Sequence, residues 1–227
     1  MTDGDKMVLT RLQAQRFYDR FGKKQDKQSF YEDAALDDLI AHGEFEQAQT
    51  VFEFGCGTGR LASRLLTNHL SPSATYFGID LSQTMTAIAK QGLSPFAGRA
   101  KVVQSDGSIR FPLADKAVDR VVSTYVLDLL SEDEARQVIS EAYRVLKPGG
   151  RLCLASLTYG STLASRIVSS LWQQLFRLYA PLLGGCRPIR LDALFDQHRW
   201  TIDYRKVTVQ FAVPSEVIIA SPRDIHE

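Results

Sequence analysis

The stretch Val51-Phe-Glu-Phe-Gly55-Cys-Gly57-Thr-Gly59-Arg60 decides the fold of this chain of 227 residues. Residues 50–54 predict a short apolar strand and residues 59–70 predict a helix, so the glycines form the turn between them. In an open α/β sheet, ligands bind beyond the carboxyl ends of the parallel strands, where such turns lie. Glycine lets the backbone turn tightly there and approach a ligand closely.

Strands and helices alternate beyond this loop. Further helices are predicted over 82–91 and 132–146, with Ser82 as the N-cap of the first and Lys147-Pro-Gly-Gly150 as the stop signal of the second. Further strands are predicted over 75–79, 100–104, 119–124 and 151–156. This alternation predicts a parallel sheet with helices on both faces.

Composition excludes several classes of protein. Apolar residues make up 44% and charged residues 23%, so disorder, collagen and coiled coils are poor fits. A net charge of +1 gives no electrostatic reason to expect a nucleic-acid partner. Residues 1–143 hold 16 basic and 20 acidic groups, whereas residues 144–227 hold 11 and 6. The C-terminal third is therefore better suited to an anionic partner, unless this surplus belongs to an ordinary solvated surface.

The chain shows neither metal-ligand spacing nor a targeting signal. Cys56, Cys153 and Cys186 lack zinc or redox spacing, and the histidines form no H-x-x-x-H pair, so no metal is expected. The first residues lack a basic region followed by an apolar one, and apolar runs are far below the ~20 residues of a membrane span. A reducing, cytoplasmic location is expected.

Acidic residues accompany the glycine loop. In the spacing G-x-G-x-G, the third glycine comes one residue earlier than in the dinucleotide fingerprint G-x-G-x-x-G. Glu53, before the loop, would repel a pyrophosphate and attract a cationic ligand. Asp80 ends the next strand, where a carboxylate can accept hydrogen bonds from ribose hydroxyls. Ser105-Asp106-Gly107 ends the strand after that and offers an acceptor for an exocyclic amino group. This set suits an adenosine with a ribose and no phosphates.

Together, these motifs resemble the class I S-adenosylmethionine-dependent methyltransferases over residues 45–157. The resemblance rests on the order and spacing of Glu53-Phe-Gly-Cys-Gly-Thr-Gly59, Asp80-Leu-Ser-Gln-Thr-Met85, Ser105-Asp106 followed by Phe111-Pro-Leu-Ala-Asp-Lys-Ala-Val-Asp119, and Leu146-Lys-Pro-Gly-Gly-Arg-Leu152. The sequence is most similar to the small-molecule branch that includes quinone and phospholipid-headgroup methyltransferases. Arg16-Phe-Tyr18-Asp-Arg-Phe21 is similar to the tyrosine-bearing lid segment of that branch.

The resemblance implies S-adenosyl-L-methionine as cofactor and S-adenosyl-L-homocysteine as product. The implied cofactor contacts are Glu53, Gly55, Cys56, Gly57, Gly59, Asp80, Leu81, Met85, Ser105, Asp106, Gly107 and Ser123. Among them, the glycines leave room for the methionyl part, and Glu53 orients the loop or meets the ammonium group. Asp80 holds the ribose, Leu81 and Met85 flank the adenine ring, and Asp106 meets the adenine amino group. The transferred methyl group is expected beside Ser123, Thr124 and Tyr125, at the end of the fourth strand.

Three residues are candidates for chemistry at the acceptor, namely Tyr18, Tyr125 and Asp128. Tyr18 covers the sulfonium side of the site in one interpretation and packs within the lid in the other. Asp128 is a general base in one interpretation and a helix cap in the favoured one. A sulfonium activates its own methyl group, so the protein mainly has to hold the acceptor in line with the methyl–sulfur bond. A base is needed only for an acceptor that must lose a proton.

The expected fold is α/β, Rossmann-like and doubly wound. Its mostly parallel seven-stranded sheet is expected to carry a C-terminal antiparallel hairpin strand and an N-terminal helical lid. The expected divisions of this single domain are a lid over 1–46, a cofactor-binding core over 47–157, an acceptor-side insert over 158–198 and a hairpin over 199–227. The strands of the hairpin are predicted over 201–213 and 217–220, joined at 214–216 on the edge of the sheet.

Residues 161–180 predict an amphipathic helix, with Phe176 as an aromatic exception on its polar side. In the favoured interpretation its apolar face packs on the core. In the others it roofs the pocket of a greasy acceptor, or it touches an anionic membrane surface. The basic residues available for such a surface are Arg166, Arg177, Arg187 and Arg190. The expected partner is a small, lipophilic acceptor such as a lipid or quinone, with peripheral membrane contact left open.

Two other functions stay open. One is a nicotinamide-dependent oxidoreductase, against which the early third glycine and the absence of a Tyr-x-x-x-Lys pair count. The other is a methyltransferase-like domain that binds a partner protein through the helix over 161–180. The intact set of cofactor residues argues against this second alternative.

Overall fold

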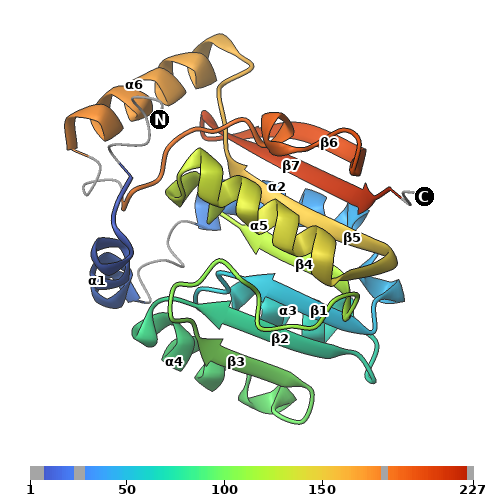
Figure 1. The fold of residues 1–227 in the computed structure, drawn as a ribbon. Helices are drawn as coiled ribbons and strands as arrows, with labels where there is room; N and C mark the ends of the chain where they lie inside the picture. The colour runs from blue at the N-terminus through green and yellow to red at the C-terminus, as the bar shows by residue number, and fades with distance from the viewer. Residues whose placement is uncertain (1–7, 23–28, 180–183, 224–227) are drawn as a thin grey trace.

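The computed structural model describes residues 8–22, 29–179 and 184–223, and it shows one sheet with helices on both faces (Figure 1). The strands are β1 Thr50–Phe54, β2 Thr75–Asp80, β3 Ala100–Gln104, β4 Val118–Thr124, β5 Leu146–Leu157, β6 Trp200–Gln210 and β7 Val213–Pro222. The helices are α1 Arg11–Phe21, α2 Ser29–His42, α3 Arg60–Asn68, α4 Gln83–Gly92, α5 Glu132–Val145 and α6 Leu163–Tyr179. Short 3-10 helices lie at Phe45–Gln47, Ser94–Phe96, Leu127–Leu129 and Leu191–Leu194.

The seven strands lie in the order β3-β2-β1-β4-β5-β7-β6. The first five of these are parallel, and β7 runs antiparallel to both β5 and β6. The chain proceeds from β1 to β2 in one direction and later returns to β4 on the other side of β1. The topology therefore reverses between β1 and β4, where an open α/β sheet binds its ligand. The predicted fold class is confirmed.

Alternate residues of the central strands enter two separate cores. Val51 and Val122 pack with α2, α3 and α4 on one face, whereas Phe52 and Val121 pack with α5 on the other. All four side chains are buried. Strands covered on both faces have near-continuous apolar sequences, which is why β-branched and aromatic residues follow one another here.

The hairpin of β6 and β7 corrects the predicted turn. The chain turns at Phe211 and Ala212, not at 214–216, and Pro214 pairs with Val209 inside the ladder. Both turn residues have positive φ, of 50° and 62°. A two-residue hairpin turn with this backbone normally contains glycine or asparagine, so the sequence carried no turn signal. Of the two hairpin strands, β6 lies at an edge of the sheet and β7 does not, because β7 pairs with β5 as well.

The start of β5 corrects a second boundary. Helix α5 ends at Val145, and the strand begins at Leu146, so that Lys147-Pro-Gly-Gly150 belongs to β5. Leu146 pairs with Val118 of β4, so the segment predicted as a stop signal is already part of the sheet.

The two N-terminal helices differ in role. Helix α2 packs on the sheet, and its Ala35, Leu36, Leu39 and Ile40 are buried with α3. Helix α1 lies away from the sheet and docks on the start of α4, because Asp19 accepts a hydrogen bond from the hydroxyl of Ser82 at 2.6 Å. Within the described part of the segment predicted as a lid, α1 lies over a cavity, and Glu32 and Leu36 of α2 also line it.

Helix α6 departs from the predicted orientation over most of its apolar face, of which Val168 and Trp172 pack against a buried cluster. Its buried residues are Ser165, Ser169 and Phe176, all from the side predicted to face solvent. The row Leu163, Ile167, Leu171, Leu175 and Leu178, predicted to face the core, is exposed. Small serine side chains let the helix approach the body of the protein closely, and the core interpretation of the apolar row is therefore wrong.

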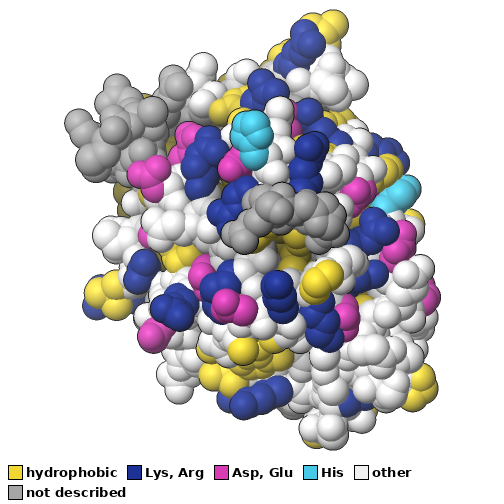
Figure 2. Space-filling view, turned by 45° about the vertical axis from the view of Figure 1, so that its right-hand side comes forward, with side chains coloured by type: hydrophobic (Ala, Val, Ile, Leu, Met, Phe, Trp, Pro, Cys, Tyr) yellow, Lys and Arg dark blue, Asp and Glu magenta, His cyan; other side chains and the backbone are white. Residues whose placement is uncertain are grey.

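On the face shown in Figure 2, basic and acidic side chains are interspersed, so neither sign of charge dominates it. Several arginines of the described chain belong to local ion pairs, such as Arg144 with Glu141 at 2.6 Å and Arg136 with Glu132 at 2.7 Å. Among the described residues, no helix is long and apolar enough to cross a membrane.

Candidate functional site

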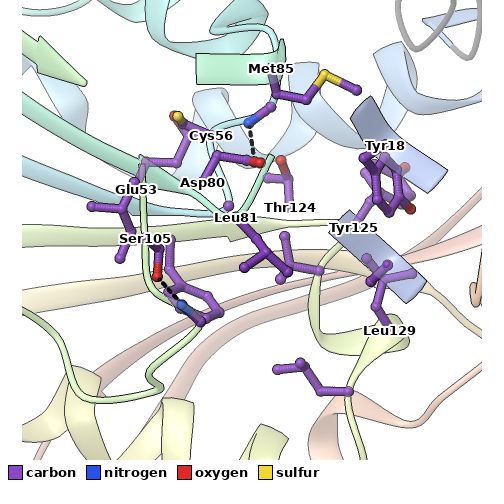
Figure 3. A pocket seen from close by; sticks show the side chains of 18 of the residues that line it. Tyr18, Glu53, Cys56, Asp80, Leu81, Met85, Ser105, Thr124, Tyr125 and Leu129 are labelled. Carbon is purple, nitrogen blue, oxygen red and sulfur yellow. Dashed lines mark hydrogen bonds between the residues drawn. The ribbon is translucent and has the colours of Figure 1, made fainter. Parts of the chain in front are cut away.

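A cavity of about 440 Å³ opens at the carboxyl ends of the central strands, and α1 lies over it. This size is that of a small-molecule site. In Figure 3, Glu53 and Ser105 lie toward one end, and Tyr18, Tyr125 and Leu129 lie toward the other. We call these the donor end and the acceptor end. Of the predicted cofactor contacts, the residues that line the cavity are Glu53, Gly55, Cys56, Gly57, Asp80, Leu81, Met85, Ser105 and Gly107.

The glycine loop needs its glycines for two reasons. Gly55, Gly57 and Gly59 all have positive φ, of 78°, 52° and 78°. A Cβ on Gly55 would also lie 2.3 Å from Cγ2 of Val126, whereas a Cβ on Gly57 would meet nothing within 4 Å. Gly57 therefore faces open space inside the cavity, where a ligand can approach the backbone. Gly59 lies at the N-cap of α3 and does not line the cavity.

Asp80 ties this loop to the end of β2. One of its carboxylate oxygens accepts a hydrogen bond from the backbone N–H of Gly57, and the other accepts from Ser82, both at 2.8 Å. Burial raises the pKa of Asp80, and these two hydrogen bonds oppose that rise. Each oxygen keeps a free lone pair, so the carboxylate can hold the loop and still accept hydrogen bonds from a ligand's hydroxyls.

Glu53 is buried, and its carboxylate accepts a hydrogen bond from the hydroxyl of Tyr76 at 2.6 Å. Burial raises the pKa of Glu53 to about 8, Asp80 adds to the rise, and the Tyr76 hydrogen bond opposes it. Glu53 therefore carries a proton over much of the neutral range while no cation is beside it. A cationic ligand group would favour the ionised form.

We predict that a ligand with an ammonium group binds more tightly as the pH rises toward about 8, and that its affinity levels off above that pH. Below that pH, Glu53 must release a proton before it can pair with the ammonium group. Calorimetric titration of S-adenosylhomocysteine in buffers of different ionisation enthalpy would measure this proton release. In Glu53→Gln the release should vanish and binding should weaken, so release that persists in this variant would assign the proton to another group.

Besides Gly59, two predicted cofactor contacts lie outside the cavity wall. Asp106 is exposed, and its carboxylate accepts a hydrogen bond from the backbone N–H of Ser108 at 2.7 Å, as in a turn. Ser123 is buried and its hydroxyl donates to the carbonyl of Phe54 at 2.9 Å, which joins β4 to β1. Ser105 does line the cavity and accepts from the N–H of Gly107 at 3.0 Å. The adenine role of Asp106 stays a prediction.

The acceptor end of the cavity is lined by both apolar side chains and two tyrosines. Tyr18 of α1 and Tyr125 at the end of β4 both line it. The hydroxyl of Tyr125 donates to Ser215 at 2.9 Å, and the hydroxyl of Tyr18 lies 3.7 Å from Sγ of Cys186. Burial raises the pKa of both tyrosines above the ordinary value, so both stay protonated at neutral pH.

Asp128 lies next to these tyrosines without lining the cavity. It is fully buried, and among the described residues neither carboxylate oxygen has a hydrogen-bond partner. Burial raises the pKa of Asp128 to about 7. The favoured helix-cap interpretation is wrong, because Ser131 caps α5 in a capping box with Glu134. Burial is the main cause that raises the pKa of Tyr18 and Tyr125, and Asp128 adds a smaller electrostatic contribution to both.

Sequence reasoning missed a second anchor of the glycine loop. Arg60, the residue after Gly59, donates to Glu32 at 2.7 Å and also pairs with Asp33, so it ties the start of α3 to α2. Arg60 and Glu32 both line the cavity. The position of Arg60 directly after the loop was a signal for this role, whereas its acidic partners lie 27 and 28 residues earlier in the chain.

Comparisons with known proteins agree with this geometry. Residues 51–150 match a family profile described as a methyltransferase domain. An uncharacterized methyltransferase of Geobacillus sp. (strain WCH70) is 28% identical over 176 residues, which cover 75% of this chain and 78% of that protein. A malonyl-[acyl-carrier protein] O-methyltransferase of Marinomonas sp. (strain MWYL1) is 32% identical over 70% of this chain and 56% of that protein. A ubiquinone/menaquinone biosynthesis C-methyltransferase of Desulfotalea psychrophila is 36% identical over 64% and 55%. The chain thus matches little more than half the length of the last two.

Solved structures share the architecture. The methyltransferase chain of a complex with the Haloferax volcanii Trm112 methyltransferase activator superposes with a TM-score of 0.74, over 94% of this chain and 99% of that chain. The YcgJ protein of Bacillus subtilis superposes with a TM-score of 0.64, over 85% and 99%. Their sequences are 15% and 16% identical to this chain, so the likeness is one of fold.

Proposed function

Because the chain belongs to the class I S-adenosylmethionine-dependent methyltransferases, we propose that it transfers a methyl group from this cofactor to a small, lipophilic acceptor. Two relatives bear names of O- and C-methyltransferases, and one of them acts in quinone biosynthesis. The acceptor that we propose for the present chain is a lipid or a quinone.

The observation that carries the proposal is the set of groups at the donor end. Glu53 offers a carboxylate for an ammonium group, Gly57 offers open backbone, and Asp80 offers lone pairs for ribose hydroxyls. Leu81 and Met85 add apolar surface for a flat ring. This donor set fits S-adenosylmethionine, which supplies an electrophilic methyl group when it is bound. No cluster of metal ligands is present among the described residues.

The composition of the acceptor end supports a lipophilic acceptor. Leu129 lies at this end, and the apolar residues that line the cavity as a whole also include Leu9, Ala14, Leu36 and Leu130. The hydroxyls of Tyr18 and Tyr125 are the polar groups placed among them, and both can orient an acceptor by hydrogen bonding.

The tyrosines position the acceptor rather than deprotonate it, since burial keeps both hydroxyls protonated. Asp128 is a buried carboxylate outside the cavity wall, and among the described residues neither of its oxygens has a hydrogen-bond partner, so it has no direct route to the acceptor. This arrangement favours an acceptor that needs little help in losing a proton. The free thiols of Cys56, Cys153 and Cys186 support a reducing, cytoplasmic location for the reaction.

The test is thermal unfolding with S-adenosylmethionine, S-adenosylhomocysteine and NADH, each in excess. At a hundred times its dissociation constant, a ligand stabilises the folded state by about 2.7 kcal/mol. We expect the two sulfur compounds to raise the unfolding midpoint by about 5–11 °C and NADH to leave it unchanged.

Methyl transfer to quinones, phospholipids and amines, followed with a labelled methyl group, then identifies the acceptor. A midpoint shift with NADH alone would favour an oxidoreductase. Cofactor binding without transfer to any acceptor class would favour a binding module instead of an enzyme.

A further inference from the structure

We propose that the outer face of α6 docks this protein on a bilayer that contains anionic lipids. The outer face is the row Leu163, Ile167, Leu171, Leu175 and Leu178. These side chains are 81%, 59%, 54%, 44% and 82% exposed. The first four follow one another at a spacing of four residues, so they form one stripe along the helix. Scattered exposed apolar residues are normal, but a continuous stripe of five marks an interaction surface.

The inner face of α6 is already satisfied, so the outer row is not a packing face that lacks its core. Ser169 accepts a hydrogen bond from the N–H of Gly160 at 3.1 Å, and the indole of Trp172 donates to the carbonyl of Cys186 at 3.0 Å. Val168 and Trp172 pack against the buried cluster around Tyr31 and Cys186. The inner side of the helix therefore holds it against the protein, and the outer row remains exposed for contact with a partner.

The charges of α6 favour an anionic bilayer as the partner of the outer row. Helix α6 contains two arginines, Arg166 and Arg177, and no Asp or Glu. Arg166 is exposed and forms no ion pair within the part of the chain that the structure describes. A helix with large apolar residues on one side, arginines and no acids is suited to lie in the interface of an anionic bilayer. A second copy would bring the same positive charge toward itself, so a bilayer is the better occupant.

The surface also adjoins the acceptor end of the cavity. Trp172 holds the carbonyl of Cys186, and Sγ of Cys186 lies 3.7 Å from the hydroxyl of Tyr18, which lines the cavity. A bilayer against α6 would thus lie against a helix that is linked to the wall of the cavity through Cys186 and Tyr18. The docking itself does not depend on the proposed methyl transfer.

The test is flotation of the full chain with vesicles of phosphatidylcholine alone or with phosphatidylglycerol added. We expect binding to the anionic vesicles, release at high salt, and an at least tenfold loss of binding in Ile167→Gln/Leu171→Gln. The matched control is Ile202→Gln/Val209→Gln, which removes two exposed apolar side chains from β6 and should bind as the wild type does. Stabilisation by S-adenosylhomocysteine, unchanged in every variant, would show that the fold and the donor end are intact.

Equal binding to both kinds of vesicle would overturn the role of charge. Absence of binding, or equal binding by the α6 variant, would overturn the proposal. A dimer in sedimentation velocity that the α6 variant dissolves, without vesicle binding by the wild type, would show that a second copy covers the row.

Discussion

Replacement of Asp80 with alanine is expected to weaken the binding of S-adenosylhomocysteine by about tenfold to a hundredfold. The carboxylate accepts from the N–H groups of Gly57 and Ser82, and in the proposed complex it also accepts from the ribose. Hydrogen bonds to a charged group contribute about 1.5–3 kcal/mol each, and the variant leaves two backbone donors unpaired. Isothermal calorimetry with the wild type and the variant measures the loss.

Asp106→Ala is the natural companion of this variant. Its carboxylate serves an exposed turn, so its removal should cost far less binding than the removal of Asp80 unless it reaches the adenine in the complex. Asp119→Ala controls for stability, because Asp119 holds Thr50 and Lys147 at the opposite ends of the strands. A variant at Asp80 that binds as the wild type does would remove the cofactor assignment.

Gly55→Ala is expected to lower the free energy of unfolding by about 2–5 kcal/mol. A residue other than glycine held at a φ of 78° costs about 1–3 kcal/mol, and the added Cβ would lie 2.3 Å from Cγ2 of Val126. Urea unfolding followed by circular dichroism measures the change.

The two causes can be separated. Gly55→Ala/Val126→Ala should recover the part due to crowding and keep the part due to φ. Gly98→Ala is the matched control, since its Cβ would meet nothing within 4 Å and its φ is not in the left-handed region, so its effect should be within about 0.5 kcal/mol. A loss in Gly55→Ala no larger than that of the control would contradict the backbone argument.

The sheet and the donor end were predictable because their determinants are local. Thr50–Phe54 and Ala100–Gln104 are strands at the predicted bounds, since short apolar runs between turn signals leave few alternatives. Glu53 and Asp80 come together because parallel strands end at one edge of the sheet. These are properties of periodicity and topology, and a single sequence carries both.

The orientation of α6 and the anchors of the site were not predictable in this way. The hydrophobic pattern identifies the apolar side of a helix but does not show which side packs against the rest of the protein. In α6, Ser165 and Ser169 are buried against the body of the protein, because their small side chains allow close approach. Asp19 docks α1 through Ser82, 63 residues away in sequence, and no local pattern encodes such a pair. The hairpin turn at Phe211 and Ala212 has positive φ at both positions but contains no glycine, so nothing in the sequence indicated it.

The donor end has a consequence for turnover. In the proposed reaction, Glu53 and Asp80 contact the ammonium group and the ribose, which the methyl donor and its demethylated product share. These two carboxylates would bind both compounds equally well, and the carboxylate of Glu32, which also lines the cavity, is already paired with Arg60. The spent cofactor should therefore bind about as tightly as the methyl donor and act as a competitive inhibitor, so that the rate at which the enzyme cycles depends on how quickly that product is removed.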